Sequence, residues 1–374
     1  MKILVTTGIF PPDVGGPARF VPEICKKLST NNDLTVITYS NKPFEEIEYD
    51  FKVLRINRNS VKLIRFLKTL KAIYKYGKEV DVIFVNGLWL EAYIINILLK
   101  KRIFRKLVGD PVWEKFNNKN NNFIDFDKFQ NEKKNFYYTF LTFLRNNSLN
   151  SSNLIIVPSD HLKLFLKKIG YNGEIIKINN GTKITDYNEE ITDNNFLIVS
   201  RLVKHKNIDL VIKAFKKIND NLVVKFKLHI VGDGPEYKNL ENLIKKLNLT
   251  EKILLTGKKN EAEVEKYYKE AKFFIQASSY EGSPHSILEA INFHNFVIAS
   301  NFGGVVEILS PNYSELIPLD QGMFNVETLY NILENTLANN LSTKSKTIEA
   351  KNNLINHYNI NNTISSYIKL FNYE

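Results

Sequence analysis

The chain has 374 residues, 44% of them apolar and 24% charged, which fits a globular protein and excludes a disordered or collagen-like one. This length exceeds one ordinary hydrophobic core and predicts two domains. A single cysteine, Cys25, excludes an internal disulfide and fits a reducing compartment. No apolar run reaches the ~18 residues that a membrane span needs.

The net charge of +11 is unevenly distributed. Residues 1–190 carry 30 Lys and Arg against 20 Asp and Glu, whereas residues 191–374 carry 21 against 20. The basic first half therefore predicts an acidic partner, such as a membrane surface, an anionic acceptor or nucleic acid. The alternative explanation, a genome-wide enrichment in lysine, should raise the positive charge of both halves, but only the first half is strongly basic. We do not expect nucleic acid, because the chain has no recognisable binding module and its aromatic residues follow core patterns.

The first half alternates strand and helix patterns, which is typical of a doubly wound parallel sheet. The opening run resembles a short signal peptide, but Gly8, Pro11 and Pro12 interrupt it, so it is interpreted as a strand. The expected strands are 2–10, 34–39, 51–56, 80–87, 154–160 and 174–182, with a further one ending at Gly109-Asp110. The expected helices are 17–28, 61–76, one starting at 88, 135–146 and 161–170.

Two features of this half predict ligand or surface contacts. Gly15 and Gly16 form a turn after the first strand where the backbone can approach a phosphate or sugar, although no dinucleotide fingerprint is present. Helix 61–76 is amphipathic and basic, which is typical of an ordinary surface helix or of one lying on an anionic membrane. The next apolar helix is followed by a basic cluster that strengthens the membrane interpretation: Lys100, Lys101, Arg102, Arg105 and Lys106.

A polar linker, 183–195, separates the halves, and the second half starts again with a strand at 197–200. Arg201 follows that strand, and Lys206 precedes the next helix. Two cations at the carboxyl edge of a parallel strand suit a diphosphate, because arginine offers a bidentate fork and lysine a point charge. A further strand is expected in 227–235, ending at the turn 232–234, another strand and loop in 252–259, and a strand, glycine turn and helix in 296–309; the tail from 325 is expected to be helical.

The stretch 271–290, AKFFIQASSYEGSPHSILEA, reads as a buried strand, a sharp loop and a helix. We expect Ser283 to cap this helix and Pro284 to occupy its first position. The unpaired N–H groups and the positive dipole end of such a helix favour a phosphate. Glu281 and Glu289 would then accept hydrogen bonds from the hydroxyls of the molecule that carries the phosphate.

The segment EGSPHSILE resembles the paired-glutamate signature of family 4 glycosyltransferases, which are retaining, use nucleotide sugars and have the GT-B fold. The resemblance implies that Glu281 meets the donor sugar and Glu289 the ribose. SRLVKHKN resembles the family's phosphate-binding segment, with Arg201 and Lys206 on the diphosphate. The turn Gly232-Asp233-Gly234 is also common in the family. The likeness runs in the same order through 196–309.

The resemblance implies an α/β GT-B fold, with two Rossmann-like domains facing each other across a cleft. The first, 1–190, would bind the acceptor, and the second, 191–354, the donor, while a last helix, about 355–374, returns to the first domain. In relatives, a histidine-containing or acidic motif occupies this place in the chain and contacts the donor sugar near the reacting carbon. Asp110 is our candidate for that role. The alternative is that Asp110 is only a turn residue before Pro111. The expected catalytic residues are Glu281, Asp110, Arg201 and Lys206. The expected donor-binding residues are Gly15, Gly16, Arg201, Lys206, Gly232, Gly282, Ser283, Pro284, His285, Ser286 and Glu289.

The function expected from this resemblance is transfer of a sugar, with retained configuration, from a UDP- or GDP-linked donor to a lipid-linked or cell-envelope glycan. No cofactor is expected, and no metal, because fixed cations can stabilise the leaving diphosphate and no Asp-x-Asp motif is present. The alternative is a nucleotide-sugar epimerase of similar architecture. The expected location is cytoplasmic, with peripheral contact on the inner face of the cytoplasmic membrane through the basic first domain.

Overall fold

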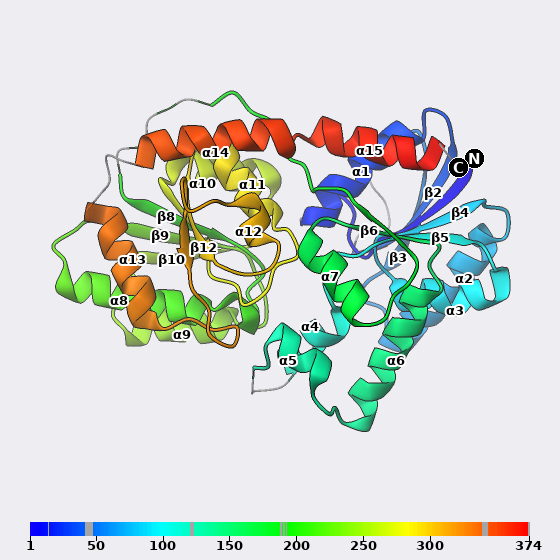
Figure 1. Ribbon diagram of the computed structural model, residues 1–374, viewed down its shortest axis with the longest axis horizontal. Helices are drawn as coiled ribbons and strands as arrows, with labels where there is room; N and C mark the ends of the chain where they lie inside the picture. The colour runs from blue at the N-terminus through cyan, green and yellow to red at the C-terminus, as the bar shows by residue number, and fades with distance from the viewer. Residues whose placement is uncertain are drawn as a thin grey trace. The chain divides into compact units, whose positions relative to one another are not determined.

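The computed structural model describes residues 1–13, 15–41, 48–119, 123–187, 189, 191, 193–338 and 343–372. The chain forms two compact units (Figure 1). The first unit comprises residues 1–108, 133–178 and 362–374, and the second comprises 109–132 and 179–361. Three stretches therefore group with the second unit: residues 109–132, 179–190 and 355–361. The boundary expected at residue 190 falls outside the described residues.

The first unit is built on a seven-stranded parallel sheet of order β3-β2-β1-β4-β5-β6-β7. Its strands are β1 (Lys2–Thr6), β2 (Asp33–Ser40), β3 (Lys52–Asn57), β4 (Val82–Val85), β5 (Arg102–Lys106), β6 (Leu154–Val157) and β7 (Glu174–Lys177). Its helices are α1 (Gly16–Leu28), α2 (Lys62–Gly77), α3 (Trp89–Leu99), α6 (Phe136–Asn150), α7 (Asp160–Lys168) and most of α15 (Ile360–Asn372).

Helices cover both faces of this sheet. Ile83 of β4 packs with Ile73 of α2 and Ile95 of α3 on one face. Phe84, the next residue, points to the other face, where its ring centroid lies 5.9 Å from that of Tyr367 in α15. Tyr367 also contacts Phe20 of α1, with the centroids 5.2 Å apart. Successive strand residues thus supply two cores, as the pleat requires when both faces are covered.

The second unit has a six-stranded parallel sheet of order β10-β9-β8-β11-β12-β13. Its strands are β8 (Asn195–Val199), β9 (Lys227–Val231), β10 (Ile253–Gly257), β11 (Phe273–Gln276), β12 (Phe296–Ser300) and β13 (Glu315–Ile317). Its helices are α4 (Pro111–Lys119), α5 (Phe126–Asn131), the 3-10 turn η1 (Lys204–Lys206), α8 (Ile208–Asn221), α9 (Tyr237–Lys246), α10 (Glu261–Glu270), α11 (His285–Asn292), α12 (Val305–Ile308), α13 (Val326–Ala338) and α14 (Thr343–His357).

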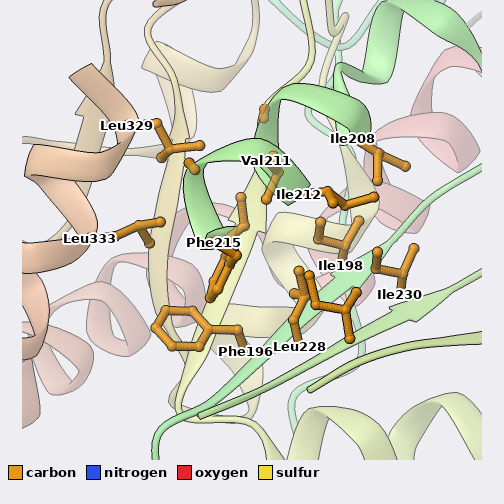
Figure 2. Packing of buried hydrophobic residues seen from close by; sticks show 14 of the residues in the cluster. Phe196, Ile198, Ile208, Val211, Ile212, Phe215, Leu228, Ile230, Leu329 and Leu333 are labelled. Carbon is orange, nitrogen blue, oxygen red and sulfur yellow. The ribbon is translucent and has the colours of Figure 1, made fainter. Parts of the chain in front are cut away.

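Figure 2 shows the core on one face of this sheet, where Phe196 and Ile198 of β8 meet Phe215 of α8 and Leu333 of α13. Leu197, between them in sequence, faces the opposite core with residues of α10, α11, α12 and α14. The alternation places one helical layer on each side, so both halves of the chain are doubly wound Rossmann-like units. This confirms the α/β fold class predicted from the sequence.

Several local predictions were wrong. The expected strands 2–10, 154–160 and 174–182 end at Thr6, Val157 and Lys177 in the structure. Arg105 and Lys106 lie in β5 and are buried, so they do not extend the basic cluster of the exposed Lys100 and Arg102 and the half-buried Lys101. Arg105 donates to Ser148 Oγ at 2.8 Å, and the Lys106 ammonium lies 3.2 Å from the centroid of the Phe20 ring. Burial lowers the pKa of Lys106 well below its usual value.

Candidate active site

The candidate site lies at the carboxyl ends of β8 and β11 in the second unit. These two strands are neighbours in the sheet, but the strands that follow them in sequence are added on opposite sides. The helices after them therefore cover opposite faces, and the loops diverge above the sheet. In open α/β sheets such a switch point leaves a crevice in which ligands bind. Arg201 and Lys206 follow β8, and Glu281 follows β11.

The two loops are fastened to each other by a buried asparagine. Asn207 adopts a left-handed backbone, with φ of 52°, between η1 and α8. Its side-chain amide donates to the Ala277 carbonyl oxygen at 2.9 Å and to Ser279 Oγ at 3.0 Å. The Ser279 amide donates in turn to the His205 carbonyl oxygen at 2.8 Å. These bonds fix the position of Lys206 relative to the loop that carries Glu281.

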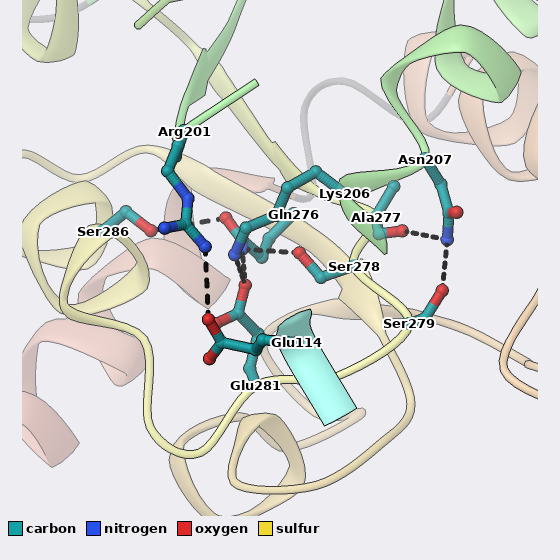
Figure 3. Close-up of polar contacts among 10 residues, drawn as sticks. All are labelled: Glu114, Arg201, Lys206, Asn207, Gln276, Ala277, Ser278, Ser279, Glu281 and Ser286. Atoms are coloured by element: carbon teal, nitrogen blue, oxygen red, sulfur yellow. Dashed lines mark hydrogen bonds and ion pairs between the residues drawn. The ribbon is translucent and has the colours of Figure 1, made fainter. Parts of the chain in front are cut away.

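Lys206 and Glu281 form an enclosed ion pair (Figure 3). Each side chain is only 14% exposed. The same Glu281 oxygen accepts a hydrogen bond from the amide of Gln276, the last residue of β11. Gln276 also donates to Ser278 Oγ at 2.9 Å, and its side-chain Oε1 accepts from Ser286 Oγ at 3.3 Å. Gln276 thus links the glutamate to the first turn of α11.

Arg201 has a different partner, Glu114 of α4. The guanidinium donates to Glu114 Oε2 at 3.2 Å, and the two side chains are 57% and 36% exposed. Desolvation raises the pKa of the Glu114 carboxyl, although the positive charges of Arg201 and Lys206 oppose the shift. Sequence reasoning missed Glu114 and Gln276. The available signals were a carboxylate one helical turn after Asp110 and a polar residue ending an apolar strand.

Asp110, the expected carboxylate from this segment, is fully buried. Its Oδ1 accepts from the Val112 amide at 2.9 Å, and its Oδ2 accepts from the Gln130 side chain at 3.0 Å. The first contact is that of a residue capping the N-terminus of α4. The geometry therefore favours the turn-aspartate alternative for Asp110, while Glu114 lies beside Arg201.

An aromatic cluster supports α4 beneath the site. The Trp113 ring lies 5.4 Å from His205 and 5.2 Å from Tyr280, and Phe126 of α5 stacks on Tyr280 at 4.3 Å, all between centroids. Burial, reinforced by Lys206 and Arg201, lowers the pKa of His205 well below its usual value, so this imidazole is neutral at pH 7. A neutral histidine leaves Arg201, Lys204 and Lys206 as the positive charges of this loop.

The helix after the loop starts one residue later than predicted. Its N-cap residue is Pro284, and no side chain caps it. Ser283 is therefore not the capping residue: its hydroxyl is buried with no partner among the described residues, and its carbonyl oxygen accepts from Asn180 Nδ2 at 2.9 Å. His285 and Ser286 form the first turn, where helical N–H groups have no partner within the helix. The expected anion seat thus begins at His285.

Glycines allow neighbouring loops to pass close to the loops that carry Glu281 and Arg201. A Cβ on Gly304 would lie 1.9 Å from the Gly282 carbonyl oxygen, and the Gly304 amide donates to the Glu281 carbonyl oxygen at 2.9 Å. A Cβ on Gly232, whose φ is 144°, would likewise lie 1.9 Å from the Ser200 carbonyl oxygen. The glycine after β9 therefore packs against the start of the Arg201 loop.

The remaining predicted site residues are placed as follows. Glu289 lies in the second turn of α11 and accepts from Tyr268 Oη at 2.9 Å. Gly15 and Gly16 lie in the first unit at the start of α1, outside the cluster formed within the second unit. Among the described residues, no group of three or more His, Cys, Asp or Glu side chains could hold a metal ion. A search of the same residues found no helix able to span a membrane.

Comparison with known proteins identifies the region that holds this site. Residues 181–353 match the family model for glycosyl transferases group 1. The matched region, just under half of the chain, is thus similar to group 1 glycosyl transferases. An uncharacterized glycosyltransferase of Methanocaldococcus jannaschii is 28% identical over 324 residues, covering 85% of this chain and 84% of that protein.

A solved structure and a further relative are also similar to this chain. The solved structure of Anabaena HepE in complex with UDP-glucose has a TM-score of 0.79 and 16% identity, with 100% of both chains covered, which confirms the predicted GT-B architecture of two Rossmann-like units. A Campylobacter jejuni N-acetylgalactosamine-N,N'-diacetylbacillosaminyl-diphospho-undecaprenol 4-alpha-N-acetylgalactosaminyltransferase is 39% identical over 101 residues, 27% of this chain and 26% of that protein. None of these matches favours the epimerase alternative.

Proposed function

We propose that this protein is a retaining glycosyltransferase of the family 4 type, which moves a sugar from a UDP- or GDP-linked donor to a lipid-linked or cell-envelope glycan during polysaccharide biosynthesis. The observation that carries the proposal is the convergence of Arg201, Lys206 and Glu281 at the switch point of the second sheet. The group 1 match over 181–353 covers all three residues.

The charges of the site suit departure of a nucleoside diphosphate. When the bond between the anomeric carbon and the diphosphate breaks, negative charge grows on the leaving oxygen, and prearranged cations lower that barrier. Arg201 and Lys206 supply the cations, and the first turn of α11 supplies N–H groups. In the free protein both cations are held by carboxylates, Glu114 and Glu281. A bound diphosphate would compete with those carboxylates.

The carboxylates then have their own roles. Glu281, released in part from Lys206, would accept hydrogen bonds from donor-sugar hydroxyls, and Glu289 would accept from the ribose. The resemblance implies attack by the acceptor on the same face of the sugar, with no protein nucleophile. Fixed cations make a metal ion unnecessary in this proposal, and no cofactor other than the donor is required.

The acceptor proposal is supported by one relative. The Campylobacter jejuni protein is named for transfer onto a sugar linked to diphospho-undecaprenol, which is a lipid carrier. The donor proposal is supported by the likeness to HepE, whose structure holds UDP-glucose. Peripheral contact of the basic first half with an anionic membrane would bring the enzyme to such an acceptor.

A substitution series tests the function. Arg201, Lys206 and Glu281 are replaced singly by alanine, and sugar transfer or donor hydrolysis is measured. We expect each change to lower turnover strongly, and near-normal turnover in all three variants would refute the proposal. A thermal-shift panel of nucleoside diphosphate sugars identifies the donor, because a ligand that binds only the folded state raises the melting temperature. Activity that survives excess chelator supports metal independence, whereas complete loss contradicts it.

A further inference from the structure

Three helices of the first unit form one layer on the same face of its sheet. Helix α3 packs against α2 on one side and against α6 on the other. On their inner sides, α2 and α3 contribute Ala72, Ile73 and Ile95 to the core on this face of the sheet. The opposite face of the sheet is covered by α1 and α15. The outward sides of α2, α3 and α6 therefore belong to a single surface of this unit (Figure 1).

On α6 this surface is aromatic. Phe136, Phe140 and Phe143 are 88%, 49% and 60% exposed. Their spacing of four and three residues places them on one stripe of the helix. The buried residues Tyr138 and Arg145 lie on the opposite side, which faces the protein. Three phenylalanines in line on the solvent side are not needed to pack this helix.

Helices α2 and α3 continue the apolar surface. On α2, Leu63 and Leu67 are exposed and recur one turn apart, opposite the buried Thr69 and Ile73. The following residues make up the outer apolar surface: Val61, Leu63, Ile64, Leu67, Ile97, Leu98, Phe136, Phe140 and Phe143. Large apolar side chains gathered on the solvent side of neighbouring helices are typical of a surface that contacts a partner or a membrane.

The charged residues on these helices are mostly basic. Lys68 and Lys71 are exposed on α2, and neither forms an ion pair with any residue in the described part of the chain. The three helices together contain a single acidic residue, Glu91, whose carboxylate accepts from Tyr39 Oη at 3.1 Å. The outer apolar surface is thus bordered by unneutralised positive charge.

We propose that the outer apolar surface docks on an anionic lipid bilayer, with the α6 phenylalanines entering the boundary between headgroups and acyl chains and the α2 lysines held by lipid phosphates. Amphipathic helices that combine aromatic and leucine side chains with lysine bind bilayers in this way. A second copy of the chain is a poorer occupant, because it would bring two positive borders together. The proposal rests on the proposed function only for its purpose, which is to meet a lipid-linked acceptor.

The test is co-sedimentation of the full chain with phosphatidylglycerol–phosphatidylcholine vesicles and with phosphatidylcholine vesicles alone. We expect binding to the anionic vesicles that weakens with added salt. Phe140→Ser/Phe143→Ser should lower the partition coefficient about tenfold or more, since two inserted rings are lost. Lys68→Glu/Lys71→Glu, which leaves the apolar side chains in place, should abolish the preference for anionic lipid.

The matched control is Val223→Ser/Ile348→Ser, which removes two exposed apolar side chains of the second unit and should bind vesicles like the wild type. Absence of wild-type binding, or binding by the phenylalanine variant equal to that of the control, overturns the proposal. Concentration-dependent dimerisation lost in the phenylalanine variant, without vesicle binding, also overturns it in favour of a second copy. Donor-induced thermal shifts in the same samples report on the proposed function separately, because they do not require the bilayer.

Discussion

Replacing Lys206 should lower the free energy of unfolding more than replacing Arg201. Lys206 is enclosed with Glu281, each side chain 14% exposed, whereas Arg201 and Glu114 are 57% and 36% exposed. Lys206→Ala leaves an enclosed carboxylate without its cation, and stranding a hydrogen-bonded charged group costs about 1–3 kcal/mol. Arg201→Ala breaks an exposed pair, which contributes at most ~1 kcal/mol. Under the proposed function, both changes remove a cation from the leaving diphosphate.

The expected result is therefore a split between stability and catalysis. Both variants should lose about 10²–10³-fold in kcat/KM, the loss typical when one donor to a developing negative charge is removed. Only Lys206→Ala should also lower the free energy of unfolding clearly. Urea unfolding and donor turnover, measured on the same preparations, give the two quantities.

A double variant separates the physical cause from simple damage. In Lys206→Ala/Glu281→Gln no carboxylate is stranded, so most of the lost stability should return while activity stays low. If the double variant is no more stable than Lys206→Ala, or if Arg201→Ala destabilises as much as Lys206→Ala, the reasoning from burial is refuted.

Three further predictions concern the frame of the site. Gly304→Ala should lower both stability and turnover, because its Cβ would lie 1.9 Å from the Gly282 carbonyl oxygen and displace the loop that carries Glu281; melting temperature and donor turnover report this. Asp110→Ala should lower the free energy of unfolding by about 2 kcal/mol, because it removes a helix cap and leaves a buried amide without its acceptor. Glu114→Ala should leave stability nearly unchanged but alter donor binding. Burial lowers the pKa of Lys351, in α14, to about 8, so above pH 8 the unfolded chain binds more protons than the folded one. The free energy of unfolding of the wild type should therefore rise between pH 8 and 10 relative to that of Lys351→Gln, as followed by urea unfolding.

Each of these has a contrary outcome. Gly8→Ala is the control for the glycine change, because no atom lies within 4 Å of its Cβ position, and equal losses in both variants would show that the close approach is unimportant. Loss of donor binding in Asp110→Ala without destabilisation would restore that residue as a direct contact. Parallel pH profiles for the wild type and the Lys351 variant would show that this amine is not titrating in the window.

The order of strands and helices could be predicted from the sequence, because the signals are local. Buried parallel strands appear as short apolar runs, and glycine, proline and polar clusters separate them from helices. The motif SRLVKHKN and the segment EGSPHSILE each follow a strand, so parallel pairing brings Arg201, Lys206 and Glu281 to one edge. The ends of elements were less secure, as the helix start at His285 and the strand end at Lys177 show.

What the sequence by itself determined was the periodic pattern of two α/β units and the identity of the charged residues at one sheet edge. The tertiary structure decided which carboxylate meets which cation. Glu114 and Arg201 are 87 positions apart, and only the packing of Trp113 against His205 and Tyr280 brings them together. It also decided that Asp110 is buried as a cap and that Arg105 lies inside, since burial depends on contacts between distant segments that no local pattern encodes.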